Sequence, residues 1–283
     1  MSTASTPVTA WATPARSSCP RRSSGPGTTA PSAERGPPML IFAACLAAAV
    51  AAPATAPVAA PKEVPREFAP PVDDPKLPRV LIIGDSVSVA YTLEVRSNLK
   101  GVANVHRVPA NGGSTRTALG EYGLDRWLRP GEKWDLIHFN HGLHDLSYRF
   151  PDDRDRNDKG EYASPSNGGR PNVPLDRYEA NLRVIVKRLK ATGARLVFAS
   201  TTPVPESDAA KYVKDSELPY NEVARRVMAE EGVKWNDLWA AVKPRQAELQ
   251  GRRNVHFLSK GSTFLAAQVA DAIRRELEAP AKK

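Results

Sequence analysis

The stretch VLIIGDSVS, residues 80–88, decides the expected fold. A run of apolar, mostly β-branched residues is typical of a strand that is buried on both faces. The run ends at Gly84 and leads toward a helix, so the hydroxyl of Ser86 is expected at the carboxyl edge of a sheet. Ligands of open α/β sheets bind at that edge. The alternative is that Ser86 is only a helix N-cap, whose side chain bonds the first-turn amides.

Strands and helices alternate after this stretch. Further buried strands are expected at residues 104–108, 134–140, 195–200 and 233–237, and helices at 90–99, around 178–189, at 220–231 and around 264–277. This alternation favours parallel strands joined by right-handed crossovers. The expected fold class is therefore α/β, with a single doubly wound (flavodoxin-like) parallel five-stranded sheet flanked by helices.

The N-terminal region does not resemble part of that domain. Residues 1–38 lack the large apolar side chains of a core, which indicates a disordered leader or a mis-annotated extension. Residues 39–56 begin with an apolar run of signal-peptide length, too short to span a bilayer comfortably. Residues 57–78 form a Pro/Ala-rich linker, and the folded domain covers 79–283. We expect a secreted or periplasmic protein; the alternative is a tail tethered to a membrane by residues 39–52.

Charge and cysteine content narrow the range of partners. The net charge is +9, but basic residues are interleaved with acidic ones, so no nucleic-acid partner is expected. Cys19 and Cys45 both precede the folded domain, which excludes a disulfide or a cysteine ligand within it. The acid-rich segment 148–176 does not have calcium-loop spacing and is a candidate substrate lid. We expect no metal and no cofactor, no stable membrane span, and leave the oligomeric state open.

Several polar residues converge on the predicted sheet edge. Ser86 follows the first strand, Gly113 the second, and His144 the third, while His256 lies in a loop before the last helix. A serine hydroxyl becomes nucleophilic when a neighbouring imidazole accepts its proton, and the resulting oxyanion needs preorganised donors. These residues therefore predict nucleophilic catalysis. His106, by contrast, is expected to face solvent, and His138 and His141 to have ordinary strand and loop roles.

The chain resembles the SGNH/GDSL hydrolase family from about residue 80 to its C-terminus. The Gly-Asp-Ser turn at 84–86, the glycine turn at 112–113 and the histidine loop carry this resemblance. It implies that Ser86 is the nucleophile and first oxyanion amide, that Gly113 is the oxyanion glycine, and that His256 is the general base and then acid. Asp85 is expected to brace the turn rather than react.

Two positions depart from the family pattern. The third-block asparagine, which donates to the oxyanion, is His144 here, and an imidazole N–H can take that role. The aspartate three residues before the histidine is Arg253, which cannot accept the imidazole N–H. A backbone carbonyl remains one candidate for orienting His256, and the side-chain candidates are Asp85, Asp145, Asp237 and Asn254. The GLHD turn (142–145) and NVHF loop (254–257) are similar to those of an exported bacterial subgroup.

The resemblance implies a serine esterase that hydrolyses carboxylic esters through a Ser-His acyl-enzyme mechanism. The preferred substrate is an O-acetyl ester on a small molecule or carbohydrate, because the segment 148–176 is polar rather than lipase-like. The alternative is a catalytically inactive SGNH-fold protein that binds carbohydrate or acts as a scaffold, which Arg253 and His144 motivate.

Overall fold

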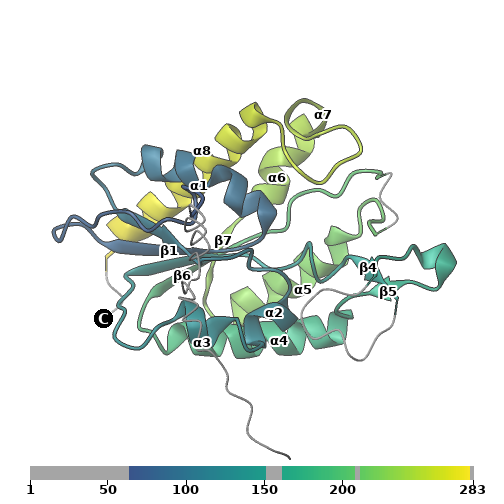
Figure 1. The fold of residues 1–283 in the computed structure, drawn as a ribbon, viewed down its shortest axis with the longest axis horizontal. Helices are drawn as coiled ribbons and strands as arrows, with labels where there is room; N and C mark the ends of the chain where they lie inside the picture. The colour runs from purple at the N-terminus through teal and green to yellow at the C-terminus, as the bar shows by residue number, and fades with distance from the viewer. Residues whose placement is uncertain (1–63, 151–160, 208–210, 281–283) are drawn as a thin grey trace, which may run out of the picture. The chain divides into compact units, whose positions relative to one another are not determined.

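The structure is a computed structural model that describes residues 64–150, 161–207 and 211–280 (Figure 1). The predicted leader and signal segment, and residues 57–63 of the predicted linker, lie outside the described residues. So do residues 151–160 of the candidate lid.

A parallel five-stranded sheet forms the centre of the described domain. Its strands have the spatial order β2-β1-β3-β6-β7, which confirms the predicted doubly wound fold class. In this order the chain direction across the sheet reverses between β1 and β3, and such a switch point is where ligands bind in α/β sheets. The strands are β1 (Arg79–Ile83), β2 (Asn104–Arg107), β3 (Leu136–Phe139), β6 (Arg195–Ala199) and β7 (Lys234–Asn236).

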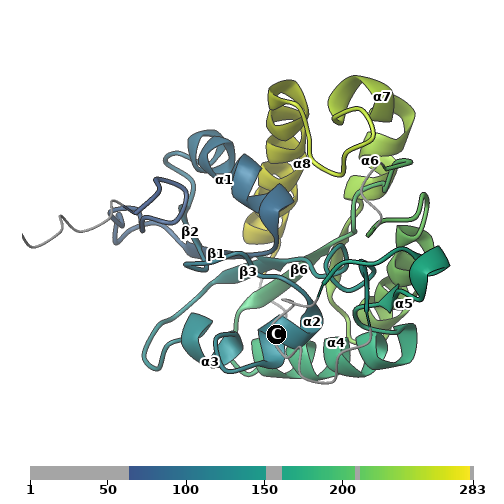
Figure 2. The same ribbon diagram turned by 45° about the vertical axis from the view of Figure 1, so that its right-hand side comes forward.

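Helices cover both faces of the sheet. Figure 2 shows α1 (Ser86–Asn98), α8 (Ser259–Glu278) and the short α6 (Leu238–Val242) and α7 (Gln246–Leu249) on one face. On the other face lie α4 (Leu175–Lys190), α5 (Glu217–Glu230) and the short α2 (Thr115–Leu119) and α3 (Leu124–Trp127). A hairpin of β4 (Tyr148–Arg149) and β5 (Arg170–Pro171) and two 3₁₀ turns, Pro165–Asn167 and Lys243–Arg245, complete the described elements.

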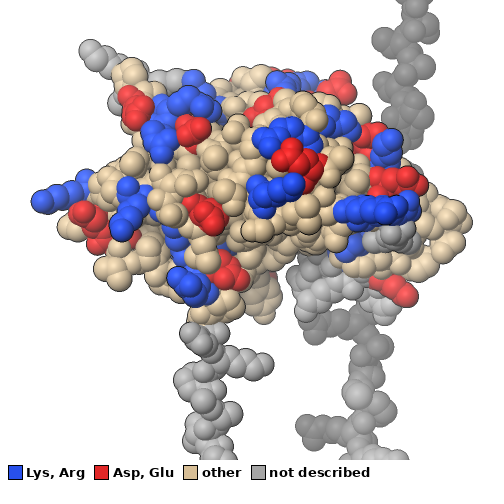
Figure 3. Space-filling view, turned by 90° about the horizontal axis from the view of Figure 1, so that it is seen from above, with Lys and Arg blue, Asp and Glu red and all other residues tan. Residues whose placement is uncertain are grey.

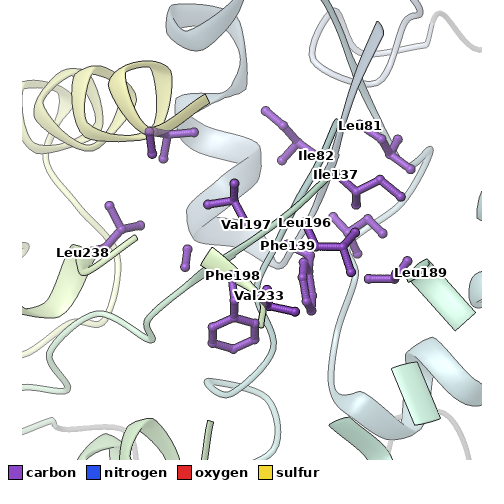
Figure 4. Packing of buried hydrophobic residues seen from close by; sticks show 14 of the residues in the cluster. Leu81, Ile82, Ile137, Phe139, Leu189, Leu196, Val197, Phe198, Val233 and Leu238 are labelled. Carbon is purple, nitrogen blue, oxygen red and sulfur yellow. The ribbon is translucent and has the colours of Figure 1, made fainter. Parts of the chain in front are cut away.

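The core lies between the sheet and these helices. Phe139 of β3 and Phe198 of β6 meet edge to face with ring centroids 5.1 Å apart, and both are fully buried. Figure 4 shows these rings beside aliphatic side chains such as Leu196 and Val233. This packing explains the uninterrupted apolar runs of the strands, since a sheet that is covered on both faces leaves no polar face.

The first helix begins four residues earlier than predicted. Its N-cap is Asp85, whose carboxylate accepts a hydrogen bond from the Val87 amide at 2.9 Å. Ser86 is therefore the first residue of α1 rather than part of a longer turn. Because β1 passes into α1 through only two residues, the hydroxyl of Ser86 stays at the carboxyl edge of the sheet.

The described part of the linker, residues 64–78, packs along the β2 edge without forming a helix or a strand. Asn104 and Asp74 exchange hydrogen bonds of 2.9 and 2.8 Å there. The prediction for His106 is wrong: its side chain is only 12% exposed, and its ring lies 2.6 Å from an oxygen of Asp73 and packs against Trp134. The reason is that Asp73, in the described part of the linker, and Trp134 cover the side chain of His106.

Cationic and anionic side chains are intermixed on the face viewed in Figure 3. On the opposite side of the sheet from α8, Arg183 of α4 lies 2.7 Å from both Glu179 and Glu230. No helix in the described ranges is long and apolar enough to cross a membrane.

Candidate active site

Ser86 and His256 meet at the carboxyl edge of the sheet. The Ser86 hydroxyl oxygen lies 2.9 Å from Nε2 of His256, although the two residues are 170 positions apart in the sequence. Ser86 begins α1, and His256 lies in the loop between α7 and α8, on the same face of the sheet as α1 (Figure 1). The structure therefore brings together the two residues that the sequence pairs as nucleophile and base.

Asn254 orients the imidazole of His256. Its side-chain oxygen lies 3.0 Å from Nδ1 of His256 and accepts the backbone N–H of the same residue at 3.0 Å. Because this oxygen accepts both bonds, Nδ1 carries a proton and Nε2 is left as the acceptor for the hydroxyl of Ser86. Ser86, His256 and Asn254 therefore lie in one hydrogen-bonded row, in which an amide oxygen occupies the place that a carboxylate has in the family pattern.

The acids considered for this role are used elsewhere. Asp85 caps α1, and the fully buried Asp145 accepts hydrogen bonds from the backbone N–H and hydroxyl of Thr115 at 2.9 and 2.5 Å. Asp237 caps α6 by accepting the Ala240 amide at 3.0 Å. None of the three acids bonds His256, so Asn254 is the predicted candidate that contacts it.

Arg253 occupies the position of the family acid. Its backbone has a φ of +52°, and its guanidinium lies 3.5 Å from Glu206. The loop around it is closed by backbone bonds from Gly251 to the carbonyl of His256 at 2.8 Å and from Asn254 to the carbonyl of Gly251 at 3.1 Å. This tight turn brings Asn254, one residue later than the family acid, to the histidine.

The glycine turn packs directly against the nucleophile turn. The Gly112 amide donates to the carbonyl of Gly84 at 2.9 Å, and a Cβ at Gly112 would lie only 2.9 Å from that oxygen. Gly113 has a φ of +57°, which favours glycine, and its amide donates to the side chain of Asn111 at 2.9 Å. The predicted oxyanion amide of Gly113 therefore has an exposed side chain as its acceptor in this structure.

Ser86 provides a further donor at this edge, and His144 lies in the turn that follows β3. The amide of Ser86 is in the first turn of α1, where an α-helix offers no internal acceptor and the helix dipole favours an anion. The backbone carbonyl of His144 accepts bonds from Ser147 and Asn172 at 2.8 and 3.0 Å. His144 is partly exposed, and no hydrogen bond of its ring is found among the described residues.

The other histidines support the sheet and the glycine turn. His138 is fully buried, with Nε2 3.1 Å from the side-chain amide of Asn236, and burial lowers its pKa to about 4. Nδ1 of His141 lies 3.2 Å from the carbonyl of Gly113. No cluster of three or more potential metal ligands occurs among the described residues.

Sequence reasoning missed two residues that shape this edge. Asn140, at the end of β3, donates to the carbonyl of Ala199 at 2.8 Å and so links the loops after β3 and β6. Arg107 places a buried guanidinium beneath the nucleophile turn. Neither belongs to a motif, and most of their contacts are with residues 15 or more positions away, so no local pattern indicates them.

Comparison with known proteins places the chain in a family. The sequence profile of the GDSL-like lipase/acylhydrolase family matches residues 82–263, which is more than half of the chain. No curated protein sequence matches the chain significantly.

Three solved structures show the same fold at low sequence identity. The acetyl xylan esterase AlAXEase has a TM-score of 0.51 at 16% identity, over 69% of this chain and 99% of that one. Axe2, an acetylxylan esterase from Geobacillus stearothermophilus, has a TM-score of 0.51 at 20% identity, over 72% of this chain and 95% of that one. A lipase/acylhydrolase from Enterococcus faecalis has a TM-score of 0.52 at 18% identity, over 70% of this chain and 96% of that one. The profile match, together with this shared fold, shows that the chain belongs to the GDSL-like lipase/acylhydrolase family.

Proposed function

We propose that the protein is a serine esterase that hydrolyses carboxylic esters. The observation that carries this proposal is the 2.9 Å contact between the Ser86 hydroxyl and Nε2 of His256, with Asn254 bound to the other ring nitrogen. An imidazole held in this tautomer is a general base for a serine nucleophile. The alternative of an inactive binding protein gives no reason for this alignment of three side chains.

The reaction proceeds in two balanced steps. The Ser86 oxygen bonds to the ester carbonyl carbon while Nε2 of His256 takes the hydroxyl proton, and the imidazolium then protonates the departing alcohol. Water next attacks the acyl-enzyme, giving its proton to His256, and the carboxylic acid leaves as the proton returns to Ser86. Asn254 stabilises the imidazolium in both steps.

The oxyanion of each tetrahedral intermediate requires nearby donors. We assign this role to the amides of Ser86 and Gly113 and to the ring N–H of His144. The Gly113 amide exchanges its bond to Asn111 for the oxyanion, and because the Asn111 side chain is exposed, water can satisfy it after this exchange. Removing one such donor typically lowers kcat by about a hundred- to a thousand-fold.

The proposed substrate is an O-acetyl ester on a small molecule or carbohydrate. The two acetylxylan esterases that share the fold support this class.

We also propose that the protein is exported to the periplasm or secreted. The support is the apolar run that begins at Met39 and the small residues that follow it, a pattern typical of a secretory signal. N-terminal sequencing of the protein recovered outside the cytoplasm tests this directly. A start within residues 50–60 agrees with export, and retention of residues 39–52 contradicts cleavage.

Esterase activity is tested with p-nitrophenyl acetate, p-nitrophenyl octanoate and acetylated xylo-oligosaccharides. The parent should prefer the acetyl esters, and Ser86→Ala and His256→Ala should each lose nearly all activity. Ser97→Ala is the matched control, because Ser97 is an exposed serine at the far end of α1. A parent that is inert on every ester but binds the oligosaccharide would favour the binding protein instead.

A further inference from the structure

Arg107, the last residue of β2, has a guanidinium that joins the two turns of the active site. Nη2 donates to the carbonyl of Gly84 at 3.0 Å and to that of Ala110 at 3.4 Å. Gly84 lies two residues before Ser86, and Ala110 lies three residues before Gly113. One side chain therefore bonds both the nucleophile turn and the glycine turn.

The other terminal nitrogen of Arg107 bonds the first two turns of α1. Nη1 donates to the hydroxyls of Ser88 and Thr92, each at 3.0 Å. Those hydroxyls in turn donate to the backbone carbonyls of Asp85 and Ser88, each at 2.7 Å. Arg107 thus holds the segment on both sides of Ser86, from Gly84 to Ser88.

The positive charge of Arg107 is buried without a direct counter-ion. The residue is 6% exposed, and no carboxylate oxygen lies within salt-bridge distance of it in the described part of the chain. Burial lowers the pKa of its guanidinium to about 10, so the group is still a cation at neutral pH. Burying a charge is costly, and a neutral donor could satisfy the same oxygen acceptors. The charge of Arg107 contributes to the potential at the turn that holds Ser86, together with the opposite charge of the Asp85 carboxylate in the same turn.

We propose that Arg107 is a positioning residue for the esterase reaction: it holds the Ser86 amide and the Gly113 turn together, and its buried charge stabilises the oxyanion. This inference rests on the proposed function. Preorganised charges in a water-poor site act more strongly on a transition state than on a neutral bound ester. The effect should therefore appear in kcat and not in KM.

Three substitutions in the full chain separate charge from hydrogen bonding. Arg107→Lys keeps the charge with fewer donors, Arg107→Gln keeps donors without charge, and Arg107→Met has neither. With p-nitrophenyl acetate, Arg107→Met and Arg107→Gln should lower kcat by about 10- to 100-fold with KM changed less than about twofold. Arg107→Lys should have a kcat at least a few-fold higher than that of Arg107→Gln.

Arg96→Gln is the matched control. Arg96 on α1 also donates to backbone carbonyls, namely those of Val105 at 2.9 Å and Ala69 at 3.0 Å, but these lie away from the turn at Ser86. This variant should lose stability while it keeps the parent kcat. Urea unfolding of all variants shows which ones are folded in the assay, and if Arg107→Met does not fold, the Lys and Gln variants decide.

The outcomes separate the two proposals. A parent kcat in folded Arg107→Gln, or an equal kcat loss in Arg96→Gln, overturns the role of Arg107 while leaving the esterase intact. Equal losses in Arg107→Lys and Arg107→Gln overturn the contribution of the charge. A parent chain without esterase activity overturns the proposed function itself.

Discussion

Replacing Asn254 with alanine removes the acceptor that orients His256. Both hydrogen bonds of its side-chain oxygen, each 3.0 Å long, end on His256, one at the ring and one at the backbone amide. In the transition state the ring is an imidazolium, and a hydrogen bond to a charged group contributes about 1.5–3 kcal/mol. His256 is exposed, so water partly replaces the lost acceptor and the lower end of this range applies.

A loss of about 1.5 kcal/mol corresponds to about a tenfold decrease in kcat, because each 1.36 kcal/mol is tenfold in rate. Asn254→Asp should act in the opposite direction: a carboxylate strengthens the same bond by about 1 kcal/mol, which gives about a fivefold increase in kcat. Both substitutions change the atom that accepts the hydrogen bond from the imidazole. A decrease in kcat for Asn254→Ala together with an increase for Asn254→Asp would therefore be specific to stabilisation of the imidazolium.

The assay is steady-state hydrolysis of p-nitrophenyl acetate, with the melting temperature measured for each variant. Arg252→Ala is the control: Arg252 is an exposed residue of the same loop, two positions before Asn254, and its replacement should leave kcat unchanged. If Asn254→Ala keeps a kcat within twofold of the parent while Ser86→Ala is inactive, Asn254 does not orient the base.

Three further predictions concern buried titratable groups. The folded-state pKa of His138, about 4, lies below its ordinary value of 6.5. The protein should therefore lose about 3 kcal/mol of unfolding free energy as the pH falls from 6.5 to 4. In urea unfolding of His138→Leu at several pH values, this loss of unfolding free energy should be absent. Burial raises the pKa of the Glu217 carboxyl, so ionisation destabilises the fold as the pH rises; Glu217→Gln should raise the melting temperature at pH 7, and no difference should remain near pH 4. Asp145→Ala leaves the amide and hydroxyl of Thr115 without their acceptor and should destabilise the fold by about 2–4 kcal/mol in urea unfolding; a change below 0.5 kcal/mol would show that the contact contributes little.

The sheet and the Ser-His pair could be predicted from local patterns. The strand VLII ends in a Gly-Asp-Ser turn, and the alternation that follows it places Ser86, Gly113 and His144 at one edge. Long apolar runs are typical of strands that are buried on both faces of the sheet, and such runs predict all five strands of the central sheet. The start of α1 differs from the prediction because Asp85, inside the Gly-Asp-Ser turn, is the N-cap of the helix.

The details of the hydrogen-bonded row could not be predicted in the same way. The loop that contains Arg253 turns through a left-handed conformation and brings Asn254 to His256, and the sequence alone left several acceptors open. No local pattern indicates the role of Arg107, because its partners lie on α1, at Gly84 and at Ala110, between 3 and 23 residues away. Such contacts depend on how β2 packs beside β1, which residue spacing does not encode.

The most direct test of the account is covalent labelling of the full chain with a fluorophosphonate, followed by intact mass measurement and peptide mapping. We predict one adduct, on Ser86, that is absent in Ser86→Ala and forms much more slowly in His256→Ala. A parent chain that takes up no label under conditions where it is folded, or an adduct on a different residue, would contradict the assignment of Ser86 as an activated nucleophile.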